Sequence, residues 1–201
     1  MLNRLVIATH NRKKAGEMVT ILSQKFPLLT LETLADFIDA PEPEETGNTY
    51  EENSAIKSIS AAKFTGEWCA ADDAGLEIDA LDGAPGVFSK RFGGEDLPFP
   101  EKISRILDLM RDVPTEKRTA RFRCVVALSS PSNSAPPELF ISTCEGQIAD
   151  EVSGNAGFGY DPIFYLPQFG CTFADMTADE KHAVSHRGKV LKMLGDRLEA
   201  L

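Results

Sequence analysis

The chain lacks the features that most quickly assign a protein to a class. Its four cysteines lie far apart and form no C-x-x-C pair, which argues against a zinc or redox centre and favours reduced, mostly buried thiols. No apolar run approaches the roughly 18 residues that a membrane helix requires, so no membrane partner is expected. The apolar stretch at residues 1–8 is too short for a secretory signal, which predicts a cytoplasmic protein.

Positive charge is also scarce. The 201 residues include 21 lysines and arginines against 31 aspartates and glutamates, giving a net charge of −10. Nonspecific binding to DNA or RNA depends on neutralising several phosphates with basic side chains, so a nucleic-acid partner is not expected. Any phosphate site in this chain must be local and assisted by a metal.

Length and hydrophobic content fit a single globular domain. The chain is 42% hydrophobic, and 201 residues suffice for one good core, so we expect one domain over residues 1–201 with room for two lobes. Residue spacing predicts strands at 4–8, 28–34, 68–71, 76–81, 118–128 and 139–148. It also predicts a helix that begins after Asn11, a short helix after the segment 177–180, and helices at 50–64, 98–110 and 186–198. This order of elements predicts an α/β fold with a mixed sheet. The strands at 118–128 and 139–148 are predicted to pair as an antiparallel hairpin, joined by the exposed Ser/Pro/Asn-rich segment 129–137.

The segment between the first strand and the first helix contains a candidate anion site. The sequence Thr9-His10-Asn11-Arg12-Lys13-Lys14 stands where helix N-terminal amides and the positive end of the helix dipole attract negative charge. Lys14 would add charge, and Thr9 and Asn11 would add donors. The segment is not a G-x-x-x-x-G-K-[ST] loop, and a polar strand end followed by an exposed basic helix explains it equally well.

Two adjacent carboxylates, Asp72 and Asp73, are the candidate catalytic groups. The sequence predicts a turn at Asp72–Gly75 between two strands. Neighbouring strand residues point to opposite faces, so the two carboxylates share a site only if this turn bends between them. One would bind a metal and the other would move a proton. Mg²⁺ suits one or two carboxylates together with substrate phosphates.

A second charged cluster surrounds the start of the helix at 50–64. Asn53 and Lys57 lie four residues apart on one helical face, and a glutamate of the preceding loop, Glu44 or Glu45, could supply a further metal ligand. Lys90 is a candidate phosphate contact, although a surface lysine is the simpler interpretation.

An aromatic ring between glycines marks a candidate site for a flat heterocycle. Phe158 stands between Gly157 and Gly159, and such flexible flanks expose a ring instead of building it into a regular element. A purine could stack on this ring. Its edge would then meet nearby polar side chains, namely Asp161, Lys181, His186 and Arg187.

Taken in order, six spaced motifs resemble the inosine triphosphate pyrophosphatase family, also called non-canonical purine nucleoside triphosphate pyrophosphatases. They are T-x-N-x-x-K at 9–14, E-E-T-G with E-N-x-x-x-K at 44–57, A-D-D-x-G-L at 71–76, G-A-P-G at 83–86, F-G-Y-D-P at 158–162 and S-H-R-G at 185–188. The resemblance covers nearly the whole chain. It implies an elongated mixed sheet flanked by helices, two lobes around a central active-site cleft, and a homodimer.

The resemblance also implies an activity and a role for each matched residue. The family uses Mg²⁺ to hydrolyse inosine, deoxyinosine and xanthosine triphosphates to the monophosphate and pyrophosphate, which cleanses the nucleotide pool. Glu45 and Asp73 would contact the metal, with Asp73 or Asp72 as the base. The substrate would be bound by Thr9, His10, Asn11, Arg12, Lys13, Lys14, Asn53, Lys57, Ala74, Lys90, Phe158, Gly159, Tyr160, Asp161, Lys181, His186 and Arg187.

Two positions depart from the family pattern, and two other functions remain open. Ala74 stands where relatives commonly have a hydroxyl residue, and His10 stands where many have glycine. A pyrophosphatase of the related septum-inhibitor type would prefer modified pyrimidines. A nucleotide sensor would bind without turnover, although Lys14 and the paired aspartates argue against it.

Overall fold

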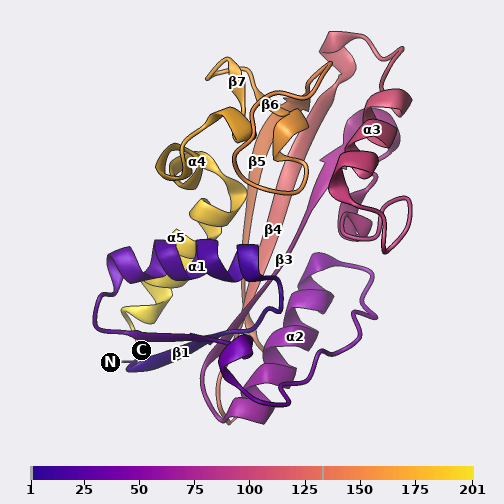
Figure 1. The fold of residues 1–201 in the computed structure, drawn as a ribbon. Coiled ribbons are helices and arrows are strands. Elements are labelled where there is room, and N and C mark those ends of the chain that lie inside the picture. Colours follow the sequence, from indigo (N-terminus) through magenta and orange to yellow (C-terminus); the bar gives the residue numbers. More distant parts are fainter. Residues whose placement is uncertain (1, 133) are drawn as a thin grey trace. The chain divides into compact units, whose positions relative to one another are not determined.

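The computed structural model describes residues 2–132 and 134–201. Met1, in the N-terminal apolar stretch, and Asn133, in the predicted exposed connection, lie outside the described residues. The strands are β1 (Arg4–Ile7), β2 (Thr30–Thr33), β3 (Cys69–Ile78), β4 (Thr119–Ser129), β5 (Glu138–Ile148), β6 (Phe164–Leu166) and β7 (Cys171–Thr172) (Figure 1). The α-helices are α1 (Arg12–Lys25), α2 (Tyr50–Thr65), α3 (Phe99–Leu109), α4 (Ala178–Val184) and α5 (His186–Leu198). Within the described ranges, no helix is long and apolar enough to cross a membrane.

The strands form a mixed sheet, as the sequence predicts. Their order among the described residues is β2-β1-β3-β4-β5-β6-β7. Strand β1 runs parallel to β2 and β3, whereas β6 runs antiparallel to β5 and β7. The N–H of Ile148 donates to the carbonyl oxygen of Arg118 over 2.9 Å, so the end of β5 lies beside the start of β4, as the predicted hairpin requires.

The chain divides into two compact units. Unit 1 comprises Met1–Asp73, Cys124–Ser142 and Arg187–Leu201, and unit 2 comprises Ala74–Arg123 and Thr143–His186. Three divisions fall inside β3, β4 and β5, so each of these strands contributes residues to both units, and the fourth follows the first residue of α5.

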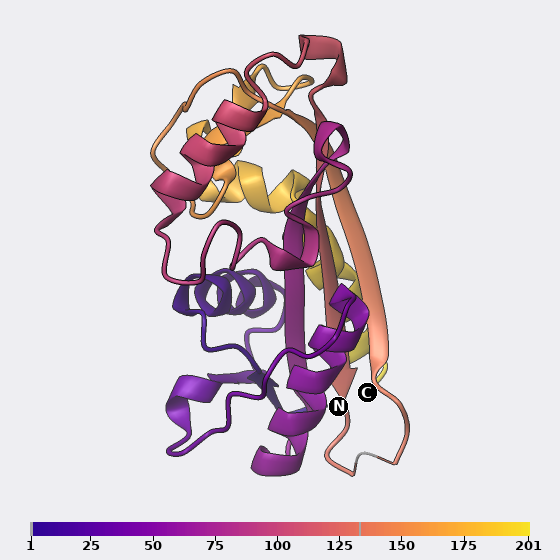
Figure 2. The same cartoon turned by 90° about the vertical axis from the view of Figure 1, so that its right-hand side faces the viewer.

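Unit 1 is built on the parallel strands β1, β2 and β3. The helix α1 buries Ala15, Met18 and Leu22, whose spacing by three and four places them on one helical face. The helix α2 begins at a capping box, in which Thr49 and Glu52 accept each other's backbone N–H, and ends at Gly66 in the left-handed conformation. The two helices run in different directions, since Figure 2 shows α1 nearly end-on and α2 from the side.

Unit 2 has an aromatic and aliphatic core. The helix α3 contributes Ile103 and Ile106, which pack in one cluster with Phe122 of β4 and with Phe164 and Phe173. The rings of Phe122 and Phe164 lie 4.7 Å apart, and those of Phe164 and Phe173 lie 5.0 Å apart. Phe164 thus packs β6 against β4, and Phe173 packs the segment that follows β7 against the same strand.

The predicted turn at Asp72–Gly75 is wrong. Strand β3 continues without interruption from Cys69 to Ile78. Its place between β1 and β4 in the sheet explains the difference, because pairing on both sides of an interior strand outweighs the turn tendency of an Asp-Asp-x-Gly sequence. The helices, in contrast, begin and end close to their predicted bounds, and the strand predicted at 28–34 shortens to β2.

Candidate active site

The candidate anion site in unit 1 is organised by the cap of α1. The side-chain oxygen of Asn11 accepts the N–H groups of Lys13 and Lys14 over 3.1 and 3.2 Å, and the Oγ1 of Thr9 accepts the N–H of Asn11 over 3.2 Å. Asn11 thus engages two of the amides that the sequence predicts to be available for an anion. Its own amide nitrogen, the Thr9 hydroxyl and the lysine side chains are the donors of this segment.

The other members of this segment lie at the surface. Arg12, Lys13 and His10 are exposed, and the Nε2 of His10 lies 3.4 Å from the carbonyl oxygen of Pro41. His10 therefore contacts the acidic loop before α2.

Asp72 is a buried carboxylate held by two cations. Lys14 Nζ lies 3.2 Å from its Oδ2, and Arg187 donates to the same oxygen through Nη2 at 3.1 Å. Burial alone would raise the pKa of Asp72, but the positive charges of Lys14 and Arg187 overcome it and hold the pKa well below the usual range. Asp72 therefore keeps its negative charge at neutral pH.

Glu17 completes this group, and the motif comparison missed it. Its Oε2 accepts from Nη1 of Arg187 over 2.6 Å. Glu17 follows Lys14 by three residues on α1, and this spacing is the signal that could have placed both on one helical face. Arg187 belongs to unit 1, where it bridges the carboxylates of Glu17 and Asp72. The family resemblance assigns Arg187 to binding of the purine base, and this role stays a prediction.

Asp73 lies in a different environment from its neighbour. Asn53 donates to its Oδ2 over 3.3 Å, and Lys57 Nζ lies 3.4 Å from its Oδ1 and 2.9 Å from Oε1 of Glu45. Burial raises the pKa of Asp73; Lys57 and Lys14 oppose this effect, and Glu45 and Asp72 add to it. For Lys57, burial lowers the pKa, but Asp73, Asp72 and Glu45 reverse the sign and leave it raised.

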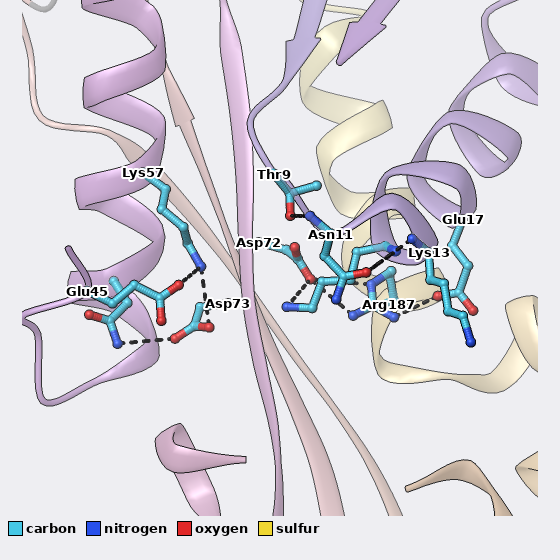
Figure 3. Close-up of polar contacts among 11 residues, drawn as sticks. Thr9, Asn11, Lys13, Glu17, Glu45, Lys57, Asp72, Asp73 and Arg187 are labelled. Carbon is cyan, nitrogen blue, oxygen red and sulfur yellow. Dashed lines mark hydrogen bonds and ion pairs between the residues drawn. The ribbon is translucent and has the colours of Figure 1, made fainter. Parts of the chain in front are cut away.

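The two aspartates point to opposite sides of β3. Figure 3 shows Asp72 on the side of α1 and Arg187, and Asp73 on the side of α2, Lys57 and Glu45. The uninterrupted strand dictates this arrangement, because successive side chains alternate between its faces. The two carboxylates therefore have separate sets of partners, and they do not face each other across a turn.

The loop before α2 is fixed by Asn53. Its Oδ1 accepts the N–H of Gly47 over 2.9 Å, while its amide nitrogen faces Asp73. A Cβ at Gly47 would lie 2.6 Å from that oxygen, so the close approach requires glycine. Asn53 thus links the loop that contains Glu45 to the face of β3 that contains Asp73.

The donor set around Asp73 consists of two carboxylates. Among the described residues, no group of three or more histidine, cysteine, aspartate or glutamate side chains could hold a metal ion. Glu45 and Asp73 share Lys57 as a neighbour, and two carboxylate ligands suffice for Mg²⁺, which retains several waters. Glu44 is exposed, so Glu45 is the better placed of the two loop glutamates.

The aromatic candidate site belongs to unit 2. The carboxylate of Asp161 accepts the N–H of Phe158 over 2.7 Å and the Nζ of Lys181 over 2.7 Å. Lys181 Nζ also lies 4.9 Å from the centroid of the Phe158 ring, in the geometry of a cation–π contact. Gly157 has a φ of 72°, and a Cβ there would lie 2.1 Å from Asp161, so only glycine fits.

The remaining predicted residues of unit 2 are placed as follows. His186 is buried and stacks on Phe122, with ring centroids 4.6 Å apart. Tyr160 donates its hydroxyl to the carbonyl oxygen of Ser89 over 2.9 Å, and burial raises the pKa of this phenol. Gly159 and Ala74 are half-buried, and Lys90 is exposed.

The cysteines match their prediction. None of the four forms a disulfide bond; Cys69, Cys124 and Cys144 are buried and Cys171 is half-buried. Burial raises the pKa of Cys69 to about 11 and that of Cys124 to about 12, which disfavours the reactive thiolate.

The protein is an α/β protein, and unit 1 contains a largely buried cluster of carboxylates and a lysine, Asp73, Glu45 and Lys57. Such an arrangement is suited to a polyanionic substrate and a divalent cation. The model of the Ham1 family matches residues 5–197. A dITP/XTP pyrophosphatase of Desulforamulus reducens is 43% identical over 98% of this chain and 96% of its own, and one of Geobacter sulfurreducens is 45% identical over 98% and 97%. The chain belongs to the Ham1 family.

Solved structures agree with this assignment. A HAM1 protein from Coxiella burnetii superposes with a TM-score of 0.88 at 40% identity, with all of both chains covered. The Ham1 protein of Staphylococcus aureus gives a TM-score of 0.86 at 36% identity over 98% of each chain. The mixed-sheet α/β class expected from the sequence is therefore confirmed.

Proposed function

We propose that the protein hydrolyses dITP, XTP and ITP to the nucleoside monophosphate and pyrophosphate, and so removes non-canonical purine nucleotides. Asp73 carries this proposal, because it is a buried carboxylate with a raised pKa beside Lys57 and Glu45. The names of relatives that are 43–45% identical supply the substrate class. A pyrimidine-directed pyrophosphatase and a sensor without turnover are the alternatives that the experiment below tests.

Phosphate binding is assigned to the cap of α1 and its lysine. Thr9, Asn11 and Lys14 would contact the phosphates, with the exposed Arg12 and Lys13 adding positive charge. Asp72 has a lowered pKa and remains charged, so its role in the proposal is to hold Lys14 and Arg187 in place. His10 would limit the space beside the cap.

Glu45 and Asp73 are the proposed Mg²⁺ ligands. When bound, Mg²⁺ would neutralise phosphate charge and polarise the phosphoryl group for attack. Lys57 lies within ion-pair distance of both carboxylates and would stabilise charge on the departing pyrophosphate. Lys90 would add a further positive charge for that group.

Asp73 is the proposed base. A water whose proton passes to Asp73 forms a bond to the α-phosphorus, and the bond from that phosphorus to the oxygen that bridges to the β-phosphate breaks. Pyrophosphate leaves with the bonding electrons, and no covalent enzyme intermediate forms. Asp72 is the less suitable base, because its Oδ2 already pairs with Lys14 and Arg187.

Purine recognition is assigned to unit 2. The base would stack on Phe158, with Gly159, Tyr160 and Asp161 shaping the segment, and Lys181 and His186 would lie near its edge. Donors that face the 6-keto group would be left unpaired by the 6-amino group of adenine. A site of this kind discriminates by roughly 10⁴-fold, which an apolar pocket does not reach.

One assay tests this proposal. The purified protein with Mg²⁺ is incubated separately with inosine, xanthosine, guanosine and adenosine triphosphates and with a modified pyrimidine triphosphate, and pyrophosphate is distinguished from orthophosphate. The proposal is supported if inosine and xanthosine triphosphates give the monophosphate and pyrophosphate and the other substrates do not. Orthophosphate release would exclude attack at the α-phosphorus, binding without turnover would favour the sensor, and preference for the pyrimidine would favour the septum-inhibitor type.

We further propose a homodimer, which the family resemblance implies, and the cytoplasmic location predicted in the sequence analysis. Light scattering coupled to size-exclusion chromatography tests the first against the 21.9 kDa of one chain. Fractionation of the source cells tests the second.

A further inference from the structure

Unit 2 contains a buried lysine that the proposed reaction does not use. Lys102 of α3 is 2% exposed, and its Nζ donates to the main-chain carbonyl oxygen of Lys90 and lies 5.4 Å from the centroid of the Phe99 ring. Burial lowers its pKa; the charge of Lys90 acts in the same direction, and Glu95 and Asp96 oppose it. A lysine is rarely buried to this extent unless its ammonium group has a partner, and here the partner is the backbone of another lysine.

The preceding peptide group is held from a different element. Tyr160 lies within the segment assigned to the base, and its hydroxyl donates to the carbonyl oxygen of Ser89 over 2.9 Å. Its ring packs edge-on against Phe99, with centroids 5.2 Å apart. Two consecutive carbonyl groups, those of Ser89 and Lys90, therefore each accept a hydrogen bond from a buried side chain.

The side chain of Ser89 fixes the same point further. Its Oγ donates to the carbonyl oxygen of Gly86 over 2.6 Å and accepts the N–H of Leu76 over 2.9 Å. Hydrogen bonds thus hold the carbonyl oxygens of Ser89 and Lys90 and the side chain of Ser89, while the side chain of Lys90 is exposed. Because the main chain is fixed here, the side chain of Lys90 can leave it in only a limited range of directions, while its ammonium group stays exposed.

We propose that Lys102 is a positioning residue for phosphate binding, which holds the main chain at Lys90 and, together with Tyr160, sets the direction in which the Lys90 ammonium group is presented to the pyrophosphate moiety. The inference rests on the proposed function, because it needs Lys90 to contact phosphate. It adds a residue that none of the six sequence motifs contains. It also couples the segment assigned to the base with a phosphate contact, since Tyr160 and Lys102 hold adjacent peptide groups.

A double-mutant cycle separates this role from simple support of the loop. The variants are Lys102→Met, Lys90→Met and the double variant, with Arg105→Met as the control. Arg105 lies one turn further along α3 and donates to the carbonyl oxygen of Gly93 in the same loop over 3.0 Å. The readouts are the KM for inosine triphosphate and the inhibition constants of pyrophosphate and inosine monophosphate.

Both Lys102→Met and Lys90→Met should raise the KM and the inhibition constant of pyrophosphate by about tenfold, the effect of losing one charged hydrogen bond. Inhibition by inosine monophosphate should change little, and Arg105→Met should leave all three constants near those of the parent. The double variant should be no worse than Lys90→Met, because both single changes remove the same contact.

An additive double variant, or an equal effect of Arg105→Met, would overturn the inference. If Lys102→Met does not fold, Tyr160→Phe takes its place in the cycle, since it removes only the hydroxyl that holds Ser89. Calorimetric binding of pyrophosphate to the same variants tests the inference even if the parent protein releases no pyrophosphate from any triphosphate. In that case the proposed function fails on turnover, and the positioning role is decided by the binding cycle alone.

Discussion

Asp72 and Asp73 are the same amino acid in adjacent positions, yet their surroundings give them opposite properties. Two cations contact Asp72 and lower its pKa, whereas burial near Glu45 raises the pKa of Asp73 despite Lys57. The first aspartate is therefore suited to holding cations, and the second to accepting a proton. Single substitutions should separate these two roles.

Asp73→Asn should remove turnover with little effect on stability. Loss of a proton acceptor lowers kcat by about 10²–10⁴-fold. The fold should change little, because Asn is nearly isosteric with Asp and Lys57 keeps the closer of its two carboxylate partners, Glu45 at 2.9 Å. Pyrophosphate release and thermal unfolding of the same preparation check this. Near-normal turnover would refute the assigned role.

Asp72→Asn should mainly destabilise the protein. The substitution leaves the buried guanidinium of Arg187 with Glu17 as its remaining carboxylate partner among the contacts described, and Lys14 loses its partner at 3.2 Å. Breaking a buried ion pair costs about 3–5 kcal/mol. Urea unfolding at neutral pH measures the change, with Glu44→Gln as a surface control. Unchanged stability would show that Asp72 is not the anchor of this cluster.

Gly157→Ala tests the segment that contains Phe158. The positive φ and the contact with Asp161 exclude a Cβ, so the substitution should displace the Asp161–Lys181 pair. The KM for inosine triphosphate should rise and the melting temperature should fall. Gly170→Ala, which has a similar φ of 68° but nothing within 4 Å of the added Cβ, is the matched control for backbone strain alone.

At the scale of elements, helix starts were predictable and the course of β3 was not. The capping boxes at Thr49–Glu52 and Thr177–Glu180 are local, because each is complete within four residues, and the structure forms both. The Asp72–Gly75 segment has the composition of a turn but lies in an interior strand, so its conformation depends on neighbours that are distant in the sequence. Glu17 and Lys102 were missed for the same reason, since their partners are Arg187 and the backbone of Lys90.

The capping box formed by Thr172 and Asp175 should make the stability of the protein depend on pH. Asp175 accepts hydrogen bonds from the backbone and side chain of Thr172 and from the hydroxyl of Ser153, and these bonds lower its pKa. A lowered folded pKa stabilises the protein above the unfolded value of about 4, and this contribution is lost as the pH falls through the folded value. The melting temperature of the parent should therefore exceed that of Asp175→Asn at pH 6, and the difference should shrink below pH ~4.

A constant difference down to acidic pH would show that hydrogen bonding, and not ionisation, accounts for the contribution of Asp175. Asp150→Asn, at an exposed carboxylate 3.5 Å from Arg118, provides a comparison at another surface position of unit 2.

At the scale of the whole molecule, the net charge of −10 is a property that the sequence alone supplies. Nonspecific binding to DNA and RNA should be absent even at about 50 mM salt. Such binding is driven by basic side chains that neutralise phosphates and release their counterions, and this chain has no excess of basic residues. Electrophoretic mobility shifts with duplex DNA and single-stranded RNA check this. A shift that disappears with added salt would reveal a basic surface that the overall charge conceals.

The alternation along β3 also affects how relatives of this chain can be compared. If a relative with the same pair of aspartates is aligned one position out of register, Asp72 of this chain is matched with the second aspartate of the relative. Because both residues are aspartate, that column shows no mismatch. The displaced column would nevertheless equate the partner of Arg187 with the partner of Lys57. Where relatives differ in length before this strand, the two residues are told apart reliably by which face of β3 each occupies, and not by their identity.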